Sequence, residues 1–291
     1  MPSALPLRDS RWLQSPDPIA DLTHQPAECR SSYADPKLER SAEVGRLAFR
    51  APLLLGGQAA RAGLSCSACH RNGRGNPHFH FPGISGEPGT ADVTASLMSS
   101  HRGDDLFNPR PIPDLAGNPA GRKVSRDPRR DDLKRFIEGL ITQEFDGPEP
   151  PPAVLDGLVD YVRSLSPDAC HGTRAETIRL GALLREVDDA VRLAELTHAA
   201  GDAATARFLI GAARSTLGRI DERFALPGGE GSRKLLREAD GDLKTIELED
   251  NVTSESFARW RSRWTARARQ LRAAEPRSLF SAAMLRRALT N

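Results

Sequence analysis

The stretch Leu64-Ser65-Cys66-Ser67-Ala68-Cys69-His70-Arg71 decides how the rest of this chain is interpreted. It places two cysteines three positions apart, with a histidine directly after the second. The pattern occurs in three kinds of site: a covalently attached haem, one half of a zinc site, and a redox dithiol.

The other cysteines argue against zinc and against a dithiol. Only Cys29 and Cys170 accompany the pair, and they lie far from it and from each other. A zinc ribbon needs a second Cys-x-x-Cys pair, which this sequence lacks. A thioredoxin-like dithiol normally lies within a βαβ pattern. No run of alternating β-branched residues surrounds Cys66 to supply one.

The adjacent His70 favours the haem. Cys-x-x-Cys-His is typical of c-type haem attachment. On one helical turn, Cys66 and Cys69 face the same side, so both thiols can form thioethers with the haem vinyl groups. His70 then projects its imidazole toward the iron as the proximal ligand. We therefore predict one covalent haem c, held by Cys66, Cys69 and His70.

The N-terminus and the net charge limit which compartment and which partners we expect. The segment "MPSALPLRDSRWLQSPDP" has no apolar core of the kind a signal peptide carries, which taken alone predicts a cytosolic protein. Covalent haem attachment takes place outside the cytoplasm, so we expect a periplasmic protein whose signal peptide is not part of this sequence. No apolar run is long enough for a transmembrane helix. With a net charge of +2 and that compartment, we expect no nucleic-acid partner.

Hydrophobic periodicity predicts an all-α protein with two domains. We expect an irregular leader over residues 1–30, a haem domain over 31–170 and an α-helical bundle over 171–291. Helical spacing of apolar residues predicts helices at 36–50, 131–141 and 153–165 in the haem domain, and a short one in "DVTASLMSSHRG" at 92–103. In the bundle it predicts helices at 174–199, 203–225, 232–249, 254–273 and 277–289, with short connections between them.

The first 170 residues resemble a class I c-type cytochrome domain, in which one helix precedes Cys-x-x-Cys-His and a C-terminal helix packs across it. Two segments are similar to the bacterial dihaem cytochrome c peroxidase family: "GTADVTASL" at 89–97 and "EFDGPEPPPAVLDGLVDYVRSL" at 144–165. This chain has one haem motif where that family has two. It also carries "LFNPRPIPDLAG" in place of the family's aromatic-Asp-Gly-Arg segment. The resemblance therefore implies a class I cytochrome c-like haem domain and leaves peroxidase activity open.

The same fold implies a disulfide. Cys29 precedes the first helix of the domain and Cys170 follows the last one. If these helices cross, the two ends of the domain meet. Two remaining cysteines in an oxidising compartment readily form a bridge, so we predict the disulfide Cys29–Cys170.

The sixth iron ligand decides the function. A Met or His there favours electron transfer, whereas an open site permits peroxide chemistry. The chain has three methionines, of which Met1 is terminal and Met284 lies in the bundle, so Met98 is the candidate thioether. His101, His80 and an open site remain alternatives, and His78 lies in the same loop as His80. Three loop arginines are expected near the haem, where one could pair with a propionate: Arg74, Arg102 and Arg110.

These alternatives lead to three functions. We expect a monohaem electron carrier. The alternatives are a peroxidase- or oxidase-like enzyme with an open site, and the haem subunit of a larger redox complex. A redox partner protein would dock at the haem edge or, if it is acidic, on the basic C-terminal helices. Residues 251–291 contain nine Arg and two Glu, and Arg259, Arg263 and Arg267 form a stripe. The plainer interpretation of this stripe is a solvated charged face.

Overall fold

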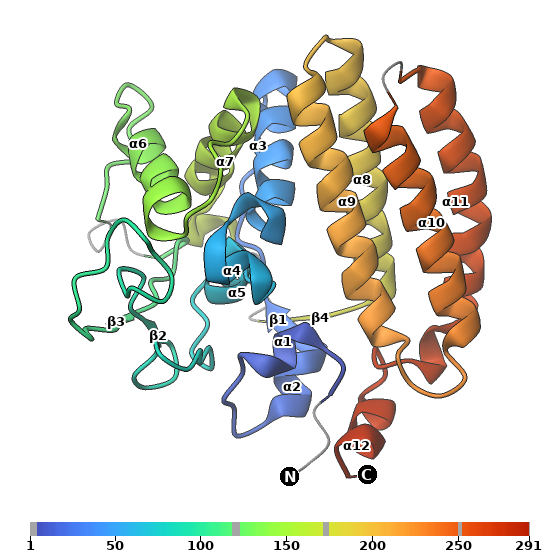
Figure 1. Cartoon of the computed structure of the whole chain (residues 1–291), viewed down its shortest axis with the longest axis horizontal. Helices are drawn as coiled ribbons and strands as arrows, with labels where there is room; N and C mark the ends of the chain where they lie inside the picture. The colour runs from blue at the N-terminus through green and yellow to red at the C-terminus, as the bar shows by residue number, and fades with distance from the viewer. Residues whose placement is uncertain (1–4, 118–122, 171–174, 250–251, 291) are drawn as a thin grey trace. The chain divides into compact units, whose positions relative to one another are not determined.

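The computed structural model describes residues 5–117, 123–170, 175–249 and 252–290, and these are mostly helical (Figure 1). The strands within these ranges are two or three residues long. Strand β1 (His24–Pro26) pairs with β4 (Ala175–Thr177), and β2 (Thr90–Ala91) pairs antiparallel with β3 (Arg110–Pro111). The predicted all-α class is confirmed.

The chain forms two compact units. One, the haem-motif unit, contains residues 12–16 and 25–176. The other, the bundle unit, contains the residues up to Arg11, residues 17–24 and everything from Thr177 onward. The boundary that we predicted at residue 171 falls in 171–174, outside the described residues.

The leader is not irregular throughout. It contains helices α1 (Arg8–Arg11) and α2 (Pro18–Thr23), and it contributes to both units. Helix α2 begins at a proline, and the Asp17 side chain caps it by accepting from the Ala20 N–H at 3.0 Å. Helices of four and six residues are too short to produce a visible 3.6-residue period, which is why the sequence pattern missed them.

The helices of the haem-motif unit include the short one that carries the two cysteines of the Cys-x-x-Cys-His motif. They are α3 (Pro36–Phe49), α4 (Gly57–Arg61), α5 (Cys66–Cys69), α6 (Asp132–Gly139) and α7 (Pro152–Ser164), and a π-helical turn over Leu140–Glu144 extends α6. The three main helices lie where the apolar spacing predicted them.

Helices α3 and α7 pack against each other, as we expected of the first and last helices of the domain. The rings of Phe49 and Tyr161 lie 5.1 Å apart between them. The chain entering α3 runs beside the chain leaving α7, because the Ser31 N–H donates to the Ser164 carbonyl at 2.9 Å. This pairing brings Cys29 and Cys170 together, with their Cα atoms 4.6 Å apart, and confirms the predicted disulfide.

The bundle unit is built on four long antiparallel neighbours. Its helices are α8 (Leu180–Ala199), α9 (Ala203–Arg223), α10 (Glu230–Leu248), α11 (Ser254–Ala274) and the shorter α12 (Ala282–Thr290). Helix α8 packs on α9, α9 on α10, α10 on α11, and α11 returns to α8, so the four close around one core (Figure 1). The predicted helical bundle is confirmed. The last helix begins later than predicted, because a 3-10 turn occupies Glu275–Arg277.

None of the helices described in this structure combines the length and the apolar character that a membrane-spanning helix requires.

Candidate haem-binding site

The haem motif forms one helical turn. Helix α5 spans the two cysteines, and the His70 N–H donates to the Cys66 carbonyl at 2.9 Å, which ends the turn at the histidine. Both thiols are free and partly buried. Burial raises the pKa of Cys66 and of Cys69 to about 12. A redox dithiol needs a lowered pKa and a reactive thiolate, so this environment does not suit that chemistry.

His70 is oriented through its Nδ1 atom, which lies 3.0 Å from the Pro113 carbonyl oxygen. Since the carbonyl can only accept, Nδ1 carries the proton and Nε2 keeps its lone pair for a metal. Burial lowers the pKa of His70 to about 4, although the Pro113 carbonyl and Asp114 oppose this shift. The imidazole is therefore neutral at pH 7, the form that binds iron.

The chain reverses sharply after His70. Asn72 has a φ of 50° and Gly73 a φ of 72°, both in the left-handed region. A Cβ on Gly73 would lie 2.5 Å from the Leu165 side chain, so a glycine is needed on steric grounds as well. The Asn72 amide donates to the Pro26 carbonyl at 2.8 Å and accepts from Arg50 at 3.0 Å. These bonds anchor the turn to segments far away in the sequence.

A buried ionic network lies beneath this turn. Glu28 accepts from Arg50 at 2.8 Å and from the Tyr161 hydroxyl at 2.7 Å. Burial by itself raises the pKa of Glu28, but Arg50, Arg46 and the Tyr161 hydroxyl outweigh it and hold the pKa below its usual value. The contacts of this network cannot be predicted from the sequence. Its members come from separate segments, and nothing in the spacing of residues 28, 50 and 161 signals their contact.

Next to the motif lies an apolar cluster, here called the Met98 cluster. Its buried members are Leu55, Ala59, Leu64, Phe79, Phe81, Ile84, Ala91 and Met98. Cys69 and Ala68 of the motif pack against it, as do Trp12, Ala62, Val93, Ala95, Ile112 and Phe145. Trp12 stacks on Phe81, with ring centroids 4.2 Å apart. Met98 is only 1% exposed. The candidate thioether therefore lies in the same apolar cluster as the second cysteine.

The helix that we predicted around Met98 does not form, so that prediction is wrong. The chain makes a series of turns there. The Asp92 side chain accepts from the Thr94 N–H at 3.2 Å and from the Thr94 hydroxyl at 2.9 Å, and its other oxygen accepts from the Asn108 N–H at 3.0 Å. Aspartate used in this way offers the backbone a turn in place of a helix.

The histidine alternatives occupy other surroundings. The His101 side chain is 63% exposed, and its Nε2 lies 3.9 Å from Asp146. In "HFHF" the alternation buries Phe79 and Phe81 and leaves His78 and His80 only partly buried. Of the candidates for a sixth ligand, Met98 is thus the one enclosed by apolar side chains.

The loop arginines have protein partners. Arg74 pairs with Asp114, with the closest nitrogen–oxygen distance 2.7 Å, and Arg102 donates to Gln143 and pairs with Glu144 at 3.5 Å. Arg110 is exposed on β3. That one of them contacts a haem propionate stays a prediction.

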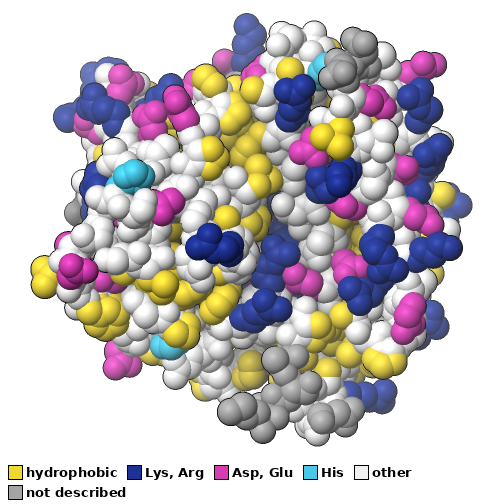
Figure 2. Space-filling model, in the orientation of Figure 1, with side chains coloured by type: hydrophobic (Ala, Val, Ile, Leu, Met, Phe, Trp, Pro, Cys, Tyr) yellow, Lys and Arg dark blue, Asp and Glu magenta, His cyan; other side chains and the backbone are white. Residues whose placement is uncertain are grey.

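The basic stripe of α11 is largely neutralised within the bundle unit. Arg263 and Arg267 both pair with Asp242 of α10, at 3.2 Å and 2.7 Å, and Arg261 pairs with Glu195 of α8. Arg259 lies 3.7 Å from Glu255. Figure 2 shows basic and acidic side chains interspersed over this unit on the face in view. The stripe is thus a charged face whose arginines pair with acidic side chains of the same unit, and an acidic partner protein there stays a prediction.

Among the described residues, no group of three or more His, Cys, Asp or Glu side chains converges on a possible metal position. A c-type haem does not require such a group, because its cysteines bond to the porphyrin and the porphyrin nitrogens hold the iron. Comparison with known proteins adds no identification: no family model, no curated protein and no solved structure matches this chain. The case for the site therefore rests on its own residues.

Proposed function

We propose that this protein is a monohaem c-type cytochrome that carries electrons. The observation that supports it most is the arrangement around α5: a Cys-x-x-Cys turn that ends in a neutral histidine, with Nδ1 bonded to Pro113 and Met98 buried in the adjoining apolar cluster. The residues fit the group: two thiols on one turn, a nitrogen ligand with its second nitrogen already bonded, and an apolar wall.

Each residue has a role in this proposal. Cys66 and Cys69 would hold the haem through thioethers, and His70 and Met98 would be the protein ligands of its iron. When bound, the haem supplies a one-electron ferric–ferrous couple. The chain holds His70 in a single tautomer through Pro113, and the Met98 cluster keeps water away from the haem face. A closed, two-ligand site of this kind favours electron transfer over substrate binding.

The packing of α3 on α7 and the disulfide support the same proposal. Helix α3 before the motif and α7 at the end of the unit pack against each other, as the resemblance to class I cytochromes implies. The Cys29–Cys170 disulfide suits an oxidising compartment, and we propose the periplasm. A redox partner protein would dock at the haem edge. The α11 stripe is the weaker candidate, because its arginines already have acidic partners in Glu255 and Asp242.

The test begins with the haem itself. The pyridine haemochrome spectrum and the intact mass should show one covalent haem in the wild type and none in a Cys66→Ser/Cys69→Ser variant. The ferric spectrum should be low-spin, with a thioether-to-iron charge-transfer band in the far red. Met98→Leu should abolish this band at little cost in packing, since the swap nearly conserves volume.

His101→Ala is the matched control and should leave the band unchanged. A chain without covalent haem would contradict the proposal altogether. A high-spin ferric iron that reacts rapidly with peroxide would replace the electron carrier with the open-site enzyme.

A further inference from the structure

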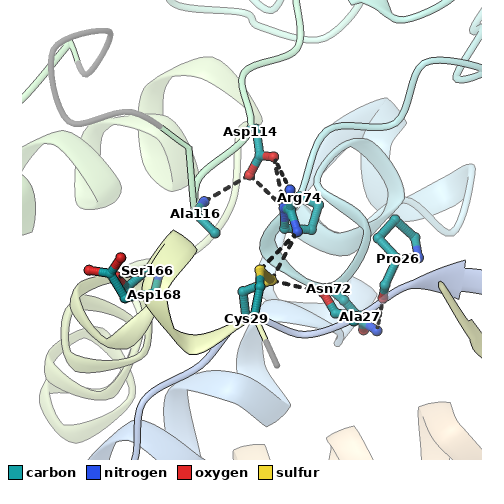
Figure 3. Close-up of a disulfide and its surroundings, with 10 residues drawn as sticks. Pro26, Ala27, Cys29, Asn72, Arg74, Asp114, Ala116, Ser166 and Asp168 are labelled. Carbon is teal, nitrogen blue, oxygen red and sulfur yellow. Dashed lines mark hydrogen bonds and ion pairs between the residues drawn. A yellow bond between two sulfur atoms is a disulfide. The ribbon is translucent and has the colours of Figure 1, made fainter. Parts of the chain in front are cut away.

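Arg74 lies between the Cys29–Cys170 disulfide and Asp114 and bonds to both (Figure 3). Its Nη1 donates to the Cys29 sulfur at 2.9 Å and to the Cys170 sulfur at 3.3 Å. Its Nε and Nη2 atoms lie 2.7 to 2.8 Å from the Asp114 carboxylate oxygens. One guanidinium therefore contacts both the disulfide and a carboxylate. The guanidinium does this with different nitrogens of one rigid planar fork, whereas a lysine would have to serve every acceptor from a single nitrogen.

Asp114 is the residue directly after Pro113, whose carbonyl accepts from His70. The carboxylate of Asp114 also accepts from the Ala116 N–H at 2.9 Å, which closes a turn just past the proline. The Leu115 N–H donates to the Gly73 carbonyl at 3.0 Å. The acceptor for His70 thus lies in a short turn held by Arg74 on one side and by the backbone of Gly73 on the other.

The disulfide gives Arg74 a rigid support. Cys29 is fully buried, and the bridge spans 141 positions of sequence. A covalent link at this point fixes both sulfur acceptors relative to each other, so the guanidinium cannot swing away without losing two contacts. Hydrogen bonds from the second nitrogen of a ligating histidine orient the ring and raise its basicity. Whatever fixes the Pro113 carbonyl therefore also acts on the metal ligand.

We propose that Arg74 is a positioning residue, supported by the Cys29–Cys170 disulfide, which holds Asp114 and thereby the Pro113 carbonyl in place for His70. The proposal rests on the proposed haem function for its consequence at the iron, but the contact itself concerns the protein alone. Because the Leu115–Gly73 bond remains when Arg74 is replaced, the Pro113 carbonyl loosens without being lost.

The experiment measures the solvent exchange of the His70 Nδ1 proton by nuclear magnetic resonance in full-length, ¹⁵N-histidine-labelled protein. The measurement uses the protein as purified, in the diamagnetic ferrous state if haem is bound and directly if it is not. Arg74→Lys keeps the charge and removes the fork, and it should accelerate exchange about tenfold, the equivalent of one hydrogen bond. Cys29→Ser/Cys170→Ser should act in the same direction. Arg61→Lys is the matched control, since among the described residues the exposed Arg61 side chain bonds to Gln58, and it should change nothing.

A second measurement carries the contact to the iron. A weaker hydrogen bond to the Pro113 carbonyl makes the His70 ring a weaker electron donor to the iron. Arg74→Lys should therefore raise the haem reduction potential, while Arg61→Lys leaves it unchanged. Unchanged proton exchange in Arg74→Lys would overturn the inference. Absence of haem in the intact mass of the wild type would overturn the proposed function instead, and the exchange measurement would still decide the role of Arg74. Thermal unfolding of each variant verifies that it is folded.

Discussion

The backbones of Gly45 and Gly157 are in direct contact where α3 meets α7. A Cβ built on Gly45 would fall inside the Gly157 carbonyl group, and one built on Gly157 would lie 2.6 Å from the Ser41 carbonyl oxygen. The two helices can pack this closely only because neither residue has a side chain. The closeness in turn lets the rings of Phe49 and Tyr161 meet, and Phe49 lies 6.4 Å from the His70 ring, measured between ring centroids.

Gly45→Ala should therefore push the two helices apart. We expect it to lower the free energy of unfolding by about 3 kcal/mol, at the upper end for an overpacked core, because backbone rather than a flexible side chain must move. Urea unfolding followed by circular dichroism measures this. Gly139→Ala in α6 is the control: its Cβ would meet nothing within 4 Å, so stability should stay equal or rise slightly. Equal stability of the two variants would contradict the close packing.

Removing the disulfide should destabilise the haem-motif unit strongly. A bridge that spans 141 positions restricts the unfolded chain considerably, so Cys29→Ser/Cys170→Ser should lose about 4 kcal/mol. Urea unfolding of the variant against oxidised wild type gives the difference. Mass spectrometry without reductant provides the independent check: thiols at both positions that can be alkylated in the native protein would show that the bridge is absent.

Glu28 should make the stability depend on pH. Its pKa is lowered in the folded protein, so its contribution is fully present above the unfolded value near 4.5 and is lost as the pH falls through the folded pKa. At pH 7, Glu28→Gln should cost about 3 kcal/mol, because it replaces the charged acceptor of Arg50 with a neutral one at a largely buried site. The gap between wild type and variant should narrow in acid below about pH 4. A gap that widens in acid would contradict the assigned direction of the shift.

Tyr161→Phe separates the hydroxyl from the charge in this network. It removes one donor to Glu28 and keeps the ring against Phe49. We expect a loss of about 2 kcal/mol at pH 7, less than for Glu28→Gln, since one hydrogen bond to a charged group disappears and the ion pair stays. Urea unfolding of both variants at the same pH compares their free energies of unfolding. A larger loss for Tyr161→Phe than for Glu28→Gln would contradict this prediction.

Arg223 should be essential to the bundle unit. It is buried, donates to the Leu22 carbonyl at 2.9 Å and to the Leu279 carbonyl at 2.8 Å, and lies 5.3 Å from the Phe280 ring centroid. Arg223→Ala leaves both carbonyls without this donor and should cost about 3 kcal/mol in urea unfolding. Arg237→Ala, at an exposed position of α10, should stay within about 0.5 kcal/mol of wild type. A similar cost for both would deny Arg223 a special role.

Sequence by itself determined the parts of this protein that depend on local spacing. Cysteines at i and i+3 with a histidine next to them identify the candidate haem turn, and a period near 3.6 located α3, α7 and the long bundle helices. The pairing of Cys29 with Cys170 followed from the implied fold and from the absence of other partners. These features need only neighbouring residues, or a simple count, to be recognised.

Tertiary structure decided the surroundings of that turn. The acceptor for His70 lies 43 positions away at Pro113, and Tyr161 reaches Glu28 across 133 positions. The Asp92 side chain accepts from Thr94 and Asn108, and turns form where the apolar pattern predicted a helix. Asp242 pairs with Arg263 and Arg267, which the sequence alone presents as an unpaired basic stripe. Such contacts form only when the fold brings distant segments together. Unlike the apolar side of a helix, the partner of a charge or of a hydrogen-bond donor does not recur at a fixed spacing, so the sequence does not predict it. The turn can therefore be predicted from the sequence, whereas the groups that orient its histidine come into contact with it only through the packing of the whole unit.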